Sequence, residues 1–181
     1  MEGPLNKEQE RFLLSLARNA ISHYLETGKT LHIDPKDSTL REKRGAFVSL
    51  KVDDQLRGCI GYPLPSNPLV ETIIESAIAA ATRDLRFLPL TADELSRTRI
   101  EISVLSVPWR IEKVSEIEVG RHGIIVSKGK NKGLLLPQVP VEWNWDRETY
   151  LRHGCLKAGL DEEEWKKGAS VEVFTAQVFS E

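Results

Sequence analysis

The sequence predicts an α+β fold. An amphipathic helical pattern opens the chain, and two pairs of short strands follow, each pair leading into a proline-containing loop, a helix and a further strand. Apolar residues at every third or fourth position indicate helices, whereas alternating ones indicate half-buried strands. With 181 residues, the chain is long enough for one domain or for two lobes that share a core.

The N-terminal helix is predicted between Asn6 and Gly28. Asn6 with Gln9 three residues later is typical of a capping box, and Gly28 is a typical helix stop. Residues 29–44 are polar and contain Pro35, so they are predicted to form a loop.

A hairpin, a loop, helices and a strand are predicted next. The hairpin turns at 53–55, and the loop is rich in proline. The remaining elements are a helix with Asn67 as N-cap and Pro68 in its first position, a short helix after the capping box Thr91–Glu94, and a strand over 100–107.

The same order recurs towards the C-terminus. It comprises a hairpin over 123–136, a proline loop, a helix from Asp146 to a stop at Gly159, and a last strand over 171–179. The repeat is consistent with an internal duplication. We therefore expect a single domain, 1–181, made of two lobes, 1–110 and 111–181, with a cleft between them of the kind that often holds a ligand site.

Composition excludes several classes of function. Lys and Arg number 25 and Asp and Glu 27, so the net charge is −2, and no nucleic-acid partner is expected. No apolar run approaches the roughly 18 residues of a membrane helix, so no membrane partner is expected. The first residues lack the apolar core of a signal peptide, and two cysteines do not indicate an oxidising compartment, so we expect a cytoplasmic protein.

The segment Leu56–Gly61 carries the most chemistry. In a regular strand Arg57, Cys59 and Gly61 fall on one face, because side chains alternate. A cation beside a thiol favours the thiolate, which is the nucleophilic form. The alternative is that Cys59 is a small buried apolar residue and that Arg57 merely covers the sheet.

A catalytic constellation can be assembled around Cys59. In it Cys59 is the nucleophile, His122 the base and Asp84 the group that orients the base. The substrate-binding residues would be Arg57 and Arg86, which suit an anionic group, with Gly58 and Gly61 leaving space beside them.

A structural alternative to this constellation stays open. In that alternative Asp84 and Arg86 pair to fix a loop, and His122 caps a hairpin. No metal site is expected, because the four histidines and two cysteines lack ligand spacing. The sequence also lacks the glycine pattern of a phosphate-binding loop. It therefore does not indicate a cofactor, which stays unknown.

Several of these segments resemble the AMMECR-type domain family. The resemblance runs from Gly45 to Phe179, and its motifs are Leu56-Arg57-Gly58-Cys59-Ile60-Gly61, Asp84-Leu85-Arg86-Phe87-Leu88-Pro89, Val119-Gly120-Arg121-His122-Gly123-Ile124, Leu136-Pro137, and the ending from Trp145 to Leu160. It implies a two-lobed α+β fold with a cleft, and relatives found beside or fused to Memo-like proteins and radical-SAM enzymes. It implies no particular reaction.

Two functions are therefore open. The first is an enzyme, or an enzyme subunit, in which Cys59 acts on a small anionic substrate in the cleft. The second is a non-catalytic binding or adaptor module that works with a Memo-like or radical-SAM partner. The exposure of Cys59 discriminates between them, since a buried neutral thiol favours the adaptor.

Overall fold

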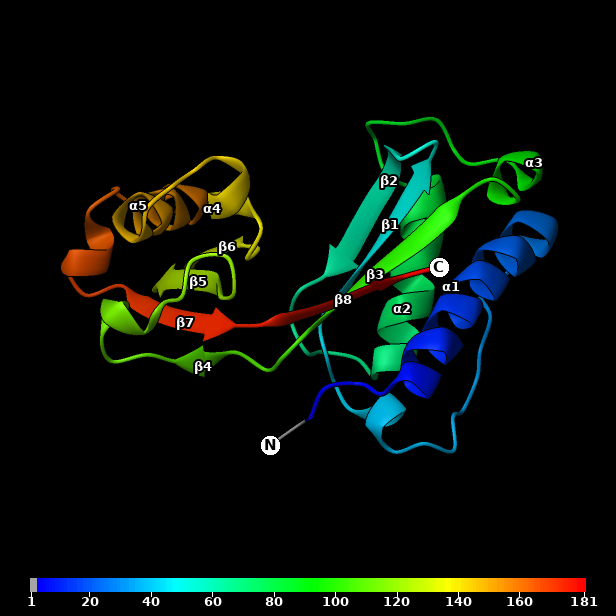
Figure 1. Cartoon of the computed structure of the whole chain (residues 1–181), viewed down its shortest axis with the longest axis horizontal. Helices are drawn as coiled ribbons and strands as arrows, with labels where there is room; N and C mark the ends of the chain where they lie inside the picture. The colour runs from blue at the N-terminus through cyan, green and yellow to red at the C-terminus, as the bar shows by residue number, and fades with distance from the viewer. Residues whose placement is uncertain (1–2) are drawn as a thin grey trace. The chain divides into compact units, whose positions relative to one another are not determined.

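The computed structural model describes residues 3–181 and confirms the α+β class (Figure 1). The chain divides into two compact units. The first unit runs to Leu105 and also contains Gln177–Glu181, whereas the second unit is the continuous stretch Ser106–Ala176. The predicted lobes differ from these units mainly at the C-terminus, where the last strand belongs to the first unit.

The first unit consists of two long helices, two short ones and four strands. They are α1 (Lys7–Thr27), η1 (Thr39–Arg41), β1 (Ala46–Val52), β2 (Gln55–Tyr62), α2 (Leu69–Thr82), α3 (Ala92–Leu95), β3 (Arg99–Leu105) and β8 (Ala176–Ser180). The second unit contains β4 (Trp109–Arg110), η2 (Val114–Glu116), β5 (Gly123–Lys128), β6 (Asn131–Leu135), α4 (Val139–Glu142), α5 (Arg147–Lys157), η3 (Glu164–Lys166) and β7 (Ser170–Phe174).

The first unit is a sheet covered on one face by α1 and α2. Its strand order is β2-β1-β3-β8, so β2 is an edge strand. Ala46, Val48 and Leu50 alternate along β1 as fully buried residues and join the core formed with the two helices. The residues between them are half-buried, which places them on the other face of the sheet.

The helix caps follow the sequence signals in α1 but not in α2. Asn6 forms the predicted capping box with Gln9, and Gly28 ends α1 with a φ of 68°. The prediction of Asn67 as N-cap of α2 is wrong, because the helix begins after Pro68 without a side-chain cap. The backbone N–H of Leu69 instead donates to the carbonyl of Glu42 at 2.9 Å, so a distant loop satisfies this helix end.

The hairpin of β1 and β2 contains a bulge at Arg57. A two-residue turn with positive φ at Asp53 and Asp54 joins the strands, as in a type I′ turn. Leu50 pairs with Gly58 but Lys51 pairs with Leu56, so Arg57 is the extra residue. The regular alternation expected through the motif is therefore broken at Arg57.

The second unit has a sheet of order β4-β7-β5-β6, against which α5 packs. Asp146 caps α5, as predicted, by accepting the backbone N–H of Thr149. The Tyr150 side chain is fully buried, and its hydroxyl lies 3.1 Å from each of the carbonyl oxygens of Leu135 and Leu136. This bond fastens α5 to the end of the β5–β6 hairpin.

The predicted last strand over 171–179 is wrong, because it is two strands in different sheets. β7 pairs with β5 in the second unit, and β8 lies beside β3 in the first. Around Thr175 the chain bonds to Ser106: the N–H of Ser106 donates to the Thr175 carbonyl, and the N–H of Thr175 donates to the Ser106 hydroxyl, both at 2.9 Å. Two further elements, β4 and α4, were not predicted, since each spans only two to four residues.

Both sheets share one strand order. Each runs from the second hairpin strand to the first, then to the strand after the helix, and then to a fourth strand, which is β8 in one unit and β4 in the other. An internal duplication stays a prediction, because strand order alone does not establish common descent.

We predict that Gly58→Ala destabilises the first unit. A Cβ at Gly58 would lie 2.2 Å from the carbonyl oxygen of Ala80 in α2, so β2 and α2 would have to separate. We expect urea unfolding to show a loss of about 1–3 kcal/mol in the free energy of unfolding. Gly3→Ala is the control, because nothing lies within 4 Å of its Cβ position. A Gly58→Ala protein as stable as the wild type would contradict this packing.

Candidate functional site

Cys59 lies on β2, with its thiol on the face of the sheet opposite the helices. Its neighbour Gly58 faces Ala80 on α2, so the alternation of side chains directs Cys59 the other way. The side chain is half-buried, and the hydroxyl of Ser49 on β1 donates to Sγ at 3.1 Å. The thiol is therefore half-buried, and its hydrogen-bond partner, the Ser49 hydroxyl, is not a general base.

Asp84 fastens the loop after α2 to the backbone of Cys59. Its side chain is only 5% exposed, and its carboxylate accepts four hydrogen bonds. The donors are the backbone N–H of Cys59 at 2.9 Å, the backbone N–H of Arg86 at 3.2 Å, and the Nε and Nη2 of Arg86 at 2.9 and 2.7 Å. The Arg86 guanidinium, with a smaller contribution from the Cys59 N–H, holds the pKa of Asp84 well below its usual range.

Arg86 completes this attachment. Its Nη2 lies 3.4 Å from the Cys59 carbonyl oxygen, so Asp84 and Arg86 together engage both backbone groups of Cys59. A neighbouring strand would engage the same two groups, which point outward because β2 is an edge strand. The Asp84 carboxylate raises the pKa of Arg86, and the Cys59 thiol adds a smaller contribution. These contacts match the alternative in which the two residues pair to fix a loop.

Arg57 contacts the loop and α3. Its Nε and Nη2 donate to the two carboxylate oxygens of Glu94 at 3.1 and 3.2 Å, and its Nη1 donates to the Leu88 carbonyl at 2.8 Å. The pKa of Glu94 is lowered, chiefly by this guanidinium. The sequence pattern pairs Arg57 with Cys59, but in the structure its guanidinium pairs with Glu94 and the Leu88 carbonyl. The guanidinium that contacts the Cys59 carbonyl is that of Arg86.

Gly58 and Gly61 are explained by close packing. A Cβ at Gly61 would lie 2.3 Å from the Ala46 carbonyl oxygen and 2.5 Å from the Phe47 ring, and Gly58 has the equivalent restriction at Ala80. Their lack of a side chain therefore lets the elements around β2 approach each other. A role for either glycine in binding a substrate stays a prediction.

His122 lies immediately before β5 in the second unit. It is buried, its ring packs edge-on against Trp109, and its Nδ1 accepts the backbone N–H of Glu118 at 3.1 Å. In a neutral imidazole the nitrogen that accepts has no proton, so Nε2 carries it. The ring would have to give up the bond to Glu118 before it could accept a proton. A meeting of His122 with Cys59 stays a prediction.

The loop after Asp84 carries two exposed leucines whose importance was not predicted from the sequence. Leu85 is 100% exposed and Leu88 is 83% exposed, whereas Phe87 between them is half-buried under the guanidiniums of Arg57 and Arg86. The backbone N–H of Phe87 donates to the Asp84 carbonyl at 3.0 Å. Apolar residues directly after the charged pair Arg83-Asp84 were the available signal, and only the exposure of the two leucines gives it meaning.

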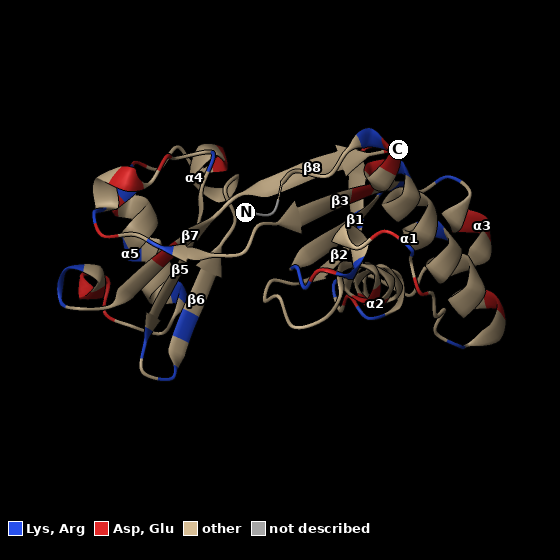
Figure 2. Cartoon of the chain, turned by 90° about the horizontal axis from the view of Figure 1, so that it is seen from below, with Lys and Arg blue, Asp and Glu red and all other residues tan. Residues whose placement is uncertain are grey.

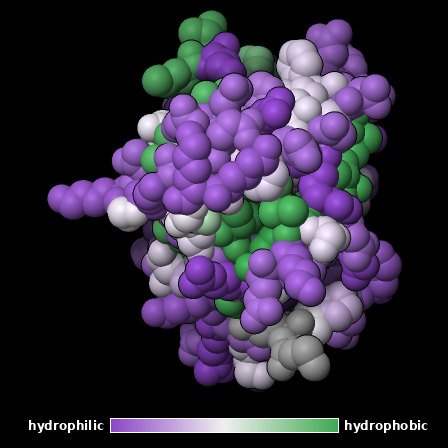
Figure 3. Space-filling model, turned by 90° about the vertical axis from the view of Figure 1, so that its left-hand side faces the viewer, coloured by the Kyte–Doolittle hydropathy of each residue, from purple (hydrophilic) through white to green (hydrophobic). Residues whose placement is uncertain are grey.

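Among residues 3–181, no group of three or more His, Cys, Asp and Glu side chains is arranged to hold a metal ion. No helix in the same range has the length and apolar character needed to cross a bilayer. Residues of both charge signs occur in both units (Figure 2), and the view from the side of α5 shows a largely hydrophilic surface with small hydrophobic areas (Figure 3).

Comparison with known proteins identifies relatives along almost the whole chain. A family model described as AMMECR1 matches residues 14–179. Protein MK0488 of Methanopyrus kandleri is 51% identical, covering 98% of this chain and 90% of its own length, and Protein MJ0810 of Methanocaldococcus jannaschii is 44% identical, covering 98% and 92%. The crystal structure of uncharacterized protein PH0010 from Pyrococcus horikoshii is similar with a TM-score of 0.85 and 46% identity, covering 98% of this chain and 93% of that one.

We predict that Asp84→Asn destabilises the protein in a pH-dependent manner. At neutral pH the change removes charged hydrogen bonds, and we expect a loss of about 2–3 kcal/mol in the free energy of unfolding. Because folding lowers the pKa of Asp84, its contribution is fully present above the unfolded value of about 3.9 and is lost as the pH falls below it. Urea unfolding from pH 6 to pH 3 should therefore show a narrowing gap between the wild type and Asp84→Asn.

A matched control separates this effect from the general effect of removing a carboxylate. Asp54 pairs with Arg99 at 2.7 Å, but its side chain is 84% exposed. We expect Asp54→Asn to change stability by less than about 1 kcal/mol. A gap for Asp84→Asn that stays constant between pH 6 and pH 3 would contradict the assignment of the four bonds to an ionised carboxylate.

Proposed function

The chain belongs to the AMMECR1 family, and we propose that it acts as a non-catalytic binding module. Its contact surface would be the presentation loop, which we define as residues 85–89. One observation carries this proposal: Leu85 and Leu88 are 100% and 83% exposed, although the backbone around them is firmly held. Exposed leucines that are held in position are suited to insertion into a partner.

The presentation loop is anchored at both ends and in its middle. The Asp84 carboxylate holds the start, the backbone N–H of Leu90 donates to the Ala81 carbonyl at 2.7 Å, and Arg57 holds the Leu88 carbonyl. Little conformational entropy is therefore lost from the loop when a partner binds. A rigid apolar contact gains affinity in this way without a large interface.

The groups that thiol catalysis would need are engaged elsewhere. Asp84 accepts four hydrogen bonds, and the Nδ1 of His122 accepts a backbone N–H. The Cys59 thiol accepts a hydrogen bond from the Ser49 hydroxyl, which is not a base at neutral pH. These contacts favour binding over catalysis. The cleft expected from the sequence and the cytoplasmic location stay predictions.

The charge near the loop indicates what the partner surface contains. Residues 83–89 include two arginines against one aspartate, and the side chain of Arg86 is 57% exposed. A matching surface would have an apolar pocket for the two leucines and carboxylates at its rim. The resemblance noted above points to a Memo-like or a radical-SAM protein as the partner, and these two proteins are the probes for a test.

We predict that a Memo-like protein from the same organism binds through the presentation loop. The double change Leu85→Ser and Leu88→Ser should weaken binding at least about tenfold, because burying two leucine side chains in a partner contributes several kcal/mol to the free energy of binding. Calorimetric titration measures the effect, and a radical-SAM protein from the same organism is titrated in parallel. Leu156→Ser on α5 is the control, because Leu156 is also exposed, at 52%, but lies in the second unit.

Two outcomes would contradict the binding proposal. The first is that neither probe binds the wild-type chain at micromolar concentration. The second is that a probe binds, but that the double change weakens it no more than Leu156→Ser does. Folding of each variant is verified by circular dichroism, and both leucines are exposed enough that their removal should leave stability nearly unchanged.

Thiol-dependent chemistry on a small anionic substrate is the second candidate. The observation in its favour is that Cys59 is half-buried rather than fully buried, on a strand whose backbone Asp84 and Arg86 hold in place. Both arginines are paired with a carboxylate, but the Arg86 side chain is 57% exposed and that of Arg57 only 18%, so the anion-binding group would be Arg86. This candidate requires that the thiol reacts in the folded protein.

We predict that iodoacetamide alkylates Cys59 in the folded chain, with a rate that rises with pH as thiolate forms. Arg86→Gln should slow this reaction several-fold, since it removes the cation next to Cys59, whereas Arg57→Gln should leave the rate unchanged. Mass spectrometry resolves alkylation at Cys59 from that at the buried Cys155, an internal control. A Cys59 that stays unreactive until unfolding would exclude thiol chemistry and leave the binding module.

A further inference from the structure

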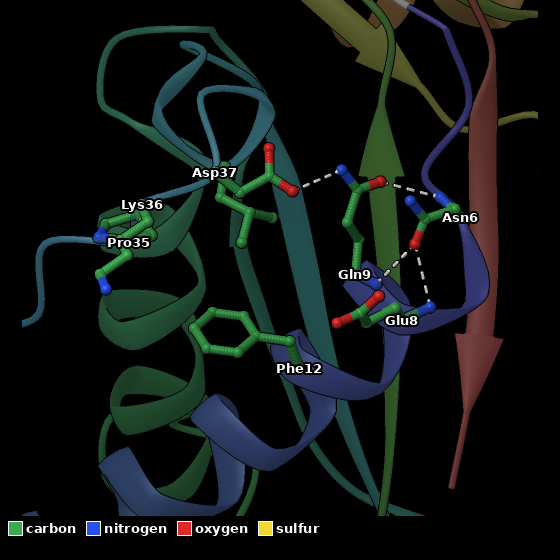
Figure 4. Close-up of a pocket in the computed structure, with 8 residues that line it drawn as sticks. Asn6, Glu8, Gln9, Phe12, Pro35, Lys36 and Asp37 are labelled. Carbon is green, nitrogen blue, oxygen red and sulfur yellow. Dashed lines mark hydrogen bonds between the residues drawn. The ribbon is translucent and has the colours of Figure 1, made fainter.

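A second site is indicated at the N-terminal end of α1, apart from the presentation loop. A cavity of about 250 Å³ lies between this end of the helix and residues 35–40 (Figure 4). Its apolar lining consists of Phe12, Pro35 and Leu40. Phe12 is 40% exposed although it lies on a helix whose other face is fully buried, so an aromatic ring is left open to a ligand.

The polar side chains around this α1 cavity are of two kinds. Asp37 is engaged, since its carboxylate accepts from the Gln9 amide at 2.7 Å and from the Thr39 N–H at 2.9 Å. Glu8 and Lys36 also line the cavity, and within residues 3–181 neither has a side-chain hydrogen bond or an ion pair. Glu8 and Phe12 lie on the helix, and Lys36 lies on the segment across the cavity from them (Figure 4).

The helix terminus itself is not the binding group. The backbone N–H groups of Glu8 and Gln9 both donate to the Asn6 side chain, so the capping box satisfies them. An anion in the cavity would have to be bound by Lys36, and a cation by Glu8. An occupant that satisfies the whole lining therefore has one charge of each sign and an apolar part.

We propose that the α1 cavity binds a free amino acid with an apolar side chain. The ammonium pairs with Glu8, the carboxylate pairs with Lys36, and the side chain packs on Phe12. The cavity is smaller than the roughly 300–1,000 Å³ of sites for drug-sized ligands, which agrees with an occupant of this size.

Two other cavities of the first unit lack this combination. One, of about 190 Å³, has Glu71 and Glu75 in its lining but no lysine or arginine for a carboxylate. The other, of about 210 Å³, lies beside Tyr62 and Leu64 and has no charged residue in its lining. Among these three cavities, only the α1 cavity has a lysine, a glutamate without a side-chain partner in the described part of the chain, and an exposed aromatic ring together in its lining.

The test is a titration of the ¹⁵N-labelled chain with L-phenylalanine, followed by NMR. We expect saturable shifts of amides in residues 7–12 and 35–40, with a dissociation constant in the low millimolar range. Phenethylamine lacks the carboxylate and 3-phenylpropionate lacks the ammonium, so each should bind at least about threefold more weakly. Glycine, which lacks the apolar part, should cause no saturable shift.

Variants assign the contacts. Lys36→Gln should weaken the binding of L-phenylalanine about threefold and leave the binding of phenethylamine, which has no carboxylate, unchanged. Glu8→Gln should likewise weaken the binding of L-phenylalanine and leave that of 3-phenylpropionate, which has no ammonium, unchanged. Phe12→Ala should weaken all three compounds. Lys132→Gln on β6 in the second unit is the matched control, and it should have no effect.

Three outcomes would overturn the proposal. They are the absence of saturable shifts up to about 20 mM L-phenylalanine, shifts confined to residues outside the α1 cavity, and equal affinity for the three aromatic compounds in wild type and Lys36→Gln. None of these outcomes depends on the presentation loop. The two proposals can therefore fail separately.

Discussion

The buried carboxylate of Asp84 is the interaction on which the candidate site depends. It joins two parts that are separate in the sequence, the edge strand β2 and the loop that follows α2. A buried carboxylate is unfavourable without partners, and here four donors provide them. The position of the Cys59 backbone, the attachment of Arg86 and the start of the presentation loop all follow from this one group.

This arrangement gives the two arginines of the motifs separate structural tasks. Arg86 completes the pairing of the Cys59 backbone, and Arg57 joins β2 to α3 through Glu94 and to the loop through the Leu88 carbonyl. The Phe87 ring lies under both guanidiniums. The two motifs that resemble a known family are thus one physical unit, in which each holds the other in place.

Local signals in the sequence predicted the local structure. The capping boxes at Asn6 and Thr91 and the stop at Gly28 depend on residues within a few positions of each other, and all three occur as expected. The pairing of Asp84 with Arg86 was among the stated alternatives for the same reason, since the two residues are neighbours in the sequence.

Features that depend on residues far apart in the chain could not be predicted from local sequence patterns. The end of α2 uses the Glu42 carbonyl in place of an Asn67 cap, and the bulge at Arg57 is set by pairing with β1. The exposure of Leu85 likewise depends on what the rest of the fold leaves uncovered. An alternating apolar pattern also continues across Thr175, so nothing in the residues themselves shows that β7 and β8 belong to different sheets.

The return of β8 to the first sheet has a consequence for the order in which the chain folds during synthesis. The second unit is continuous in sequence, so it can complete its sheet as soon as residue 176 is available. The first unit cannot, because β3 keeps an unpaired edge until residues 176–180 have been made. The N-terminal half of the protein is thus the last part to be finished, and an open strand edge is exposed to aggregation throughout that interval.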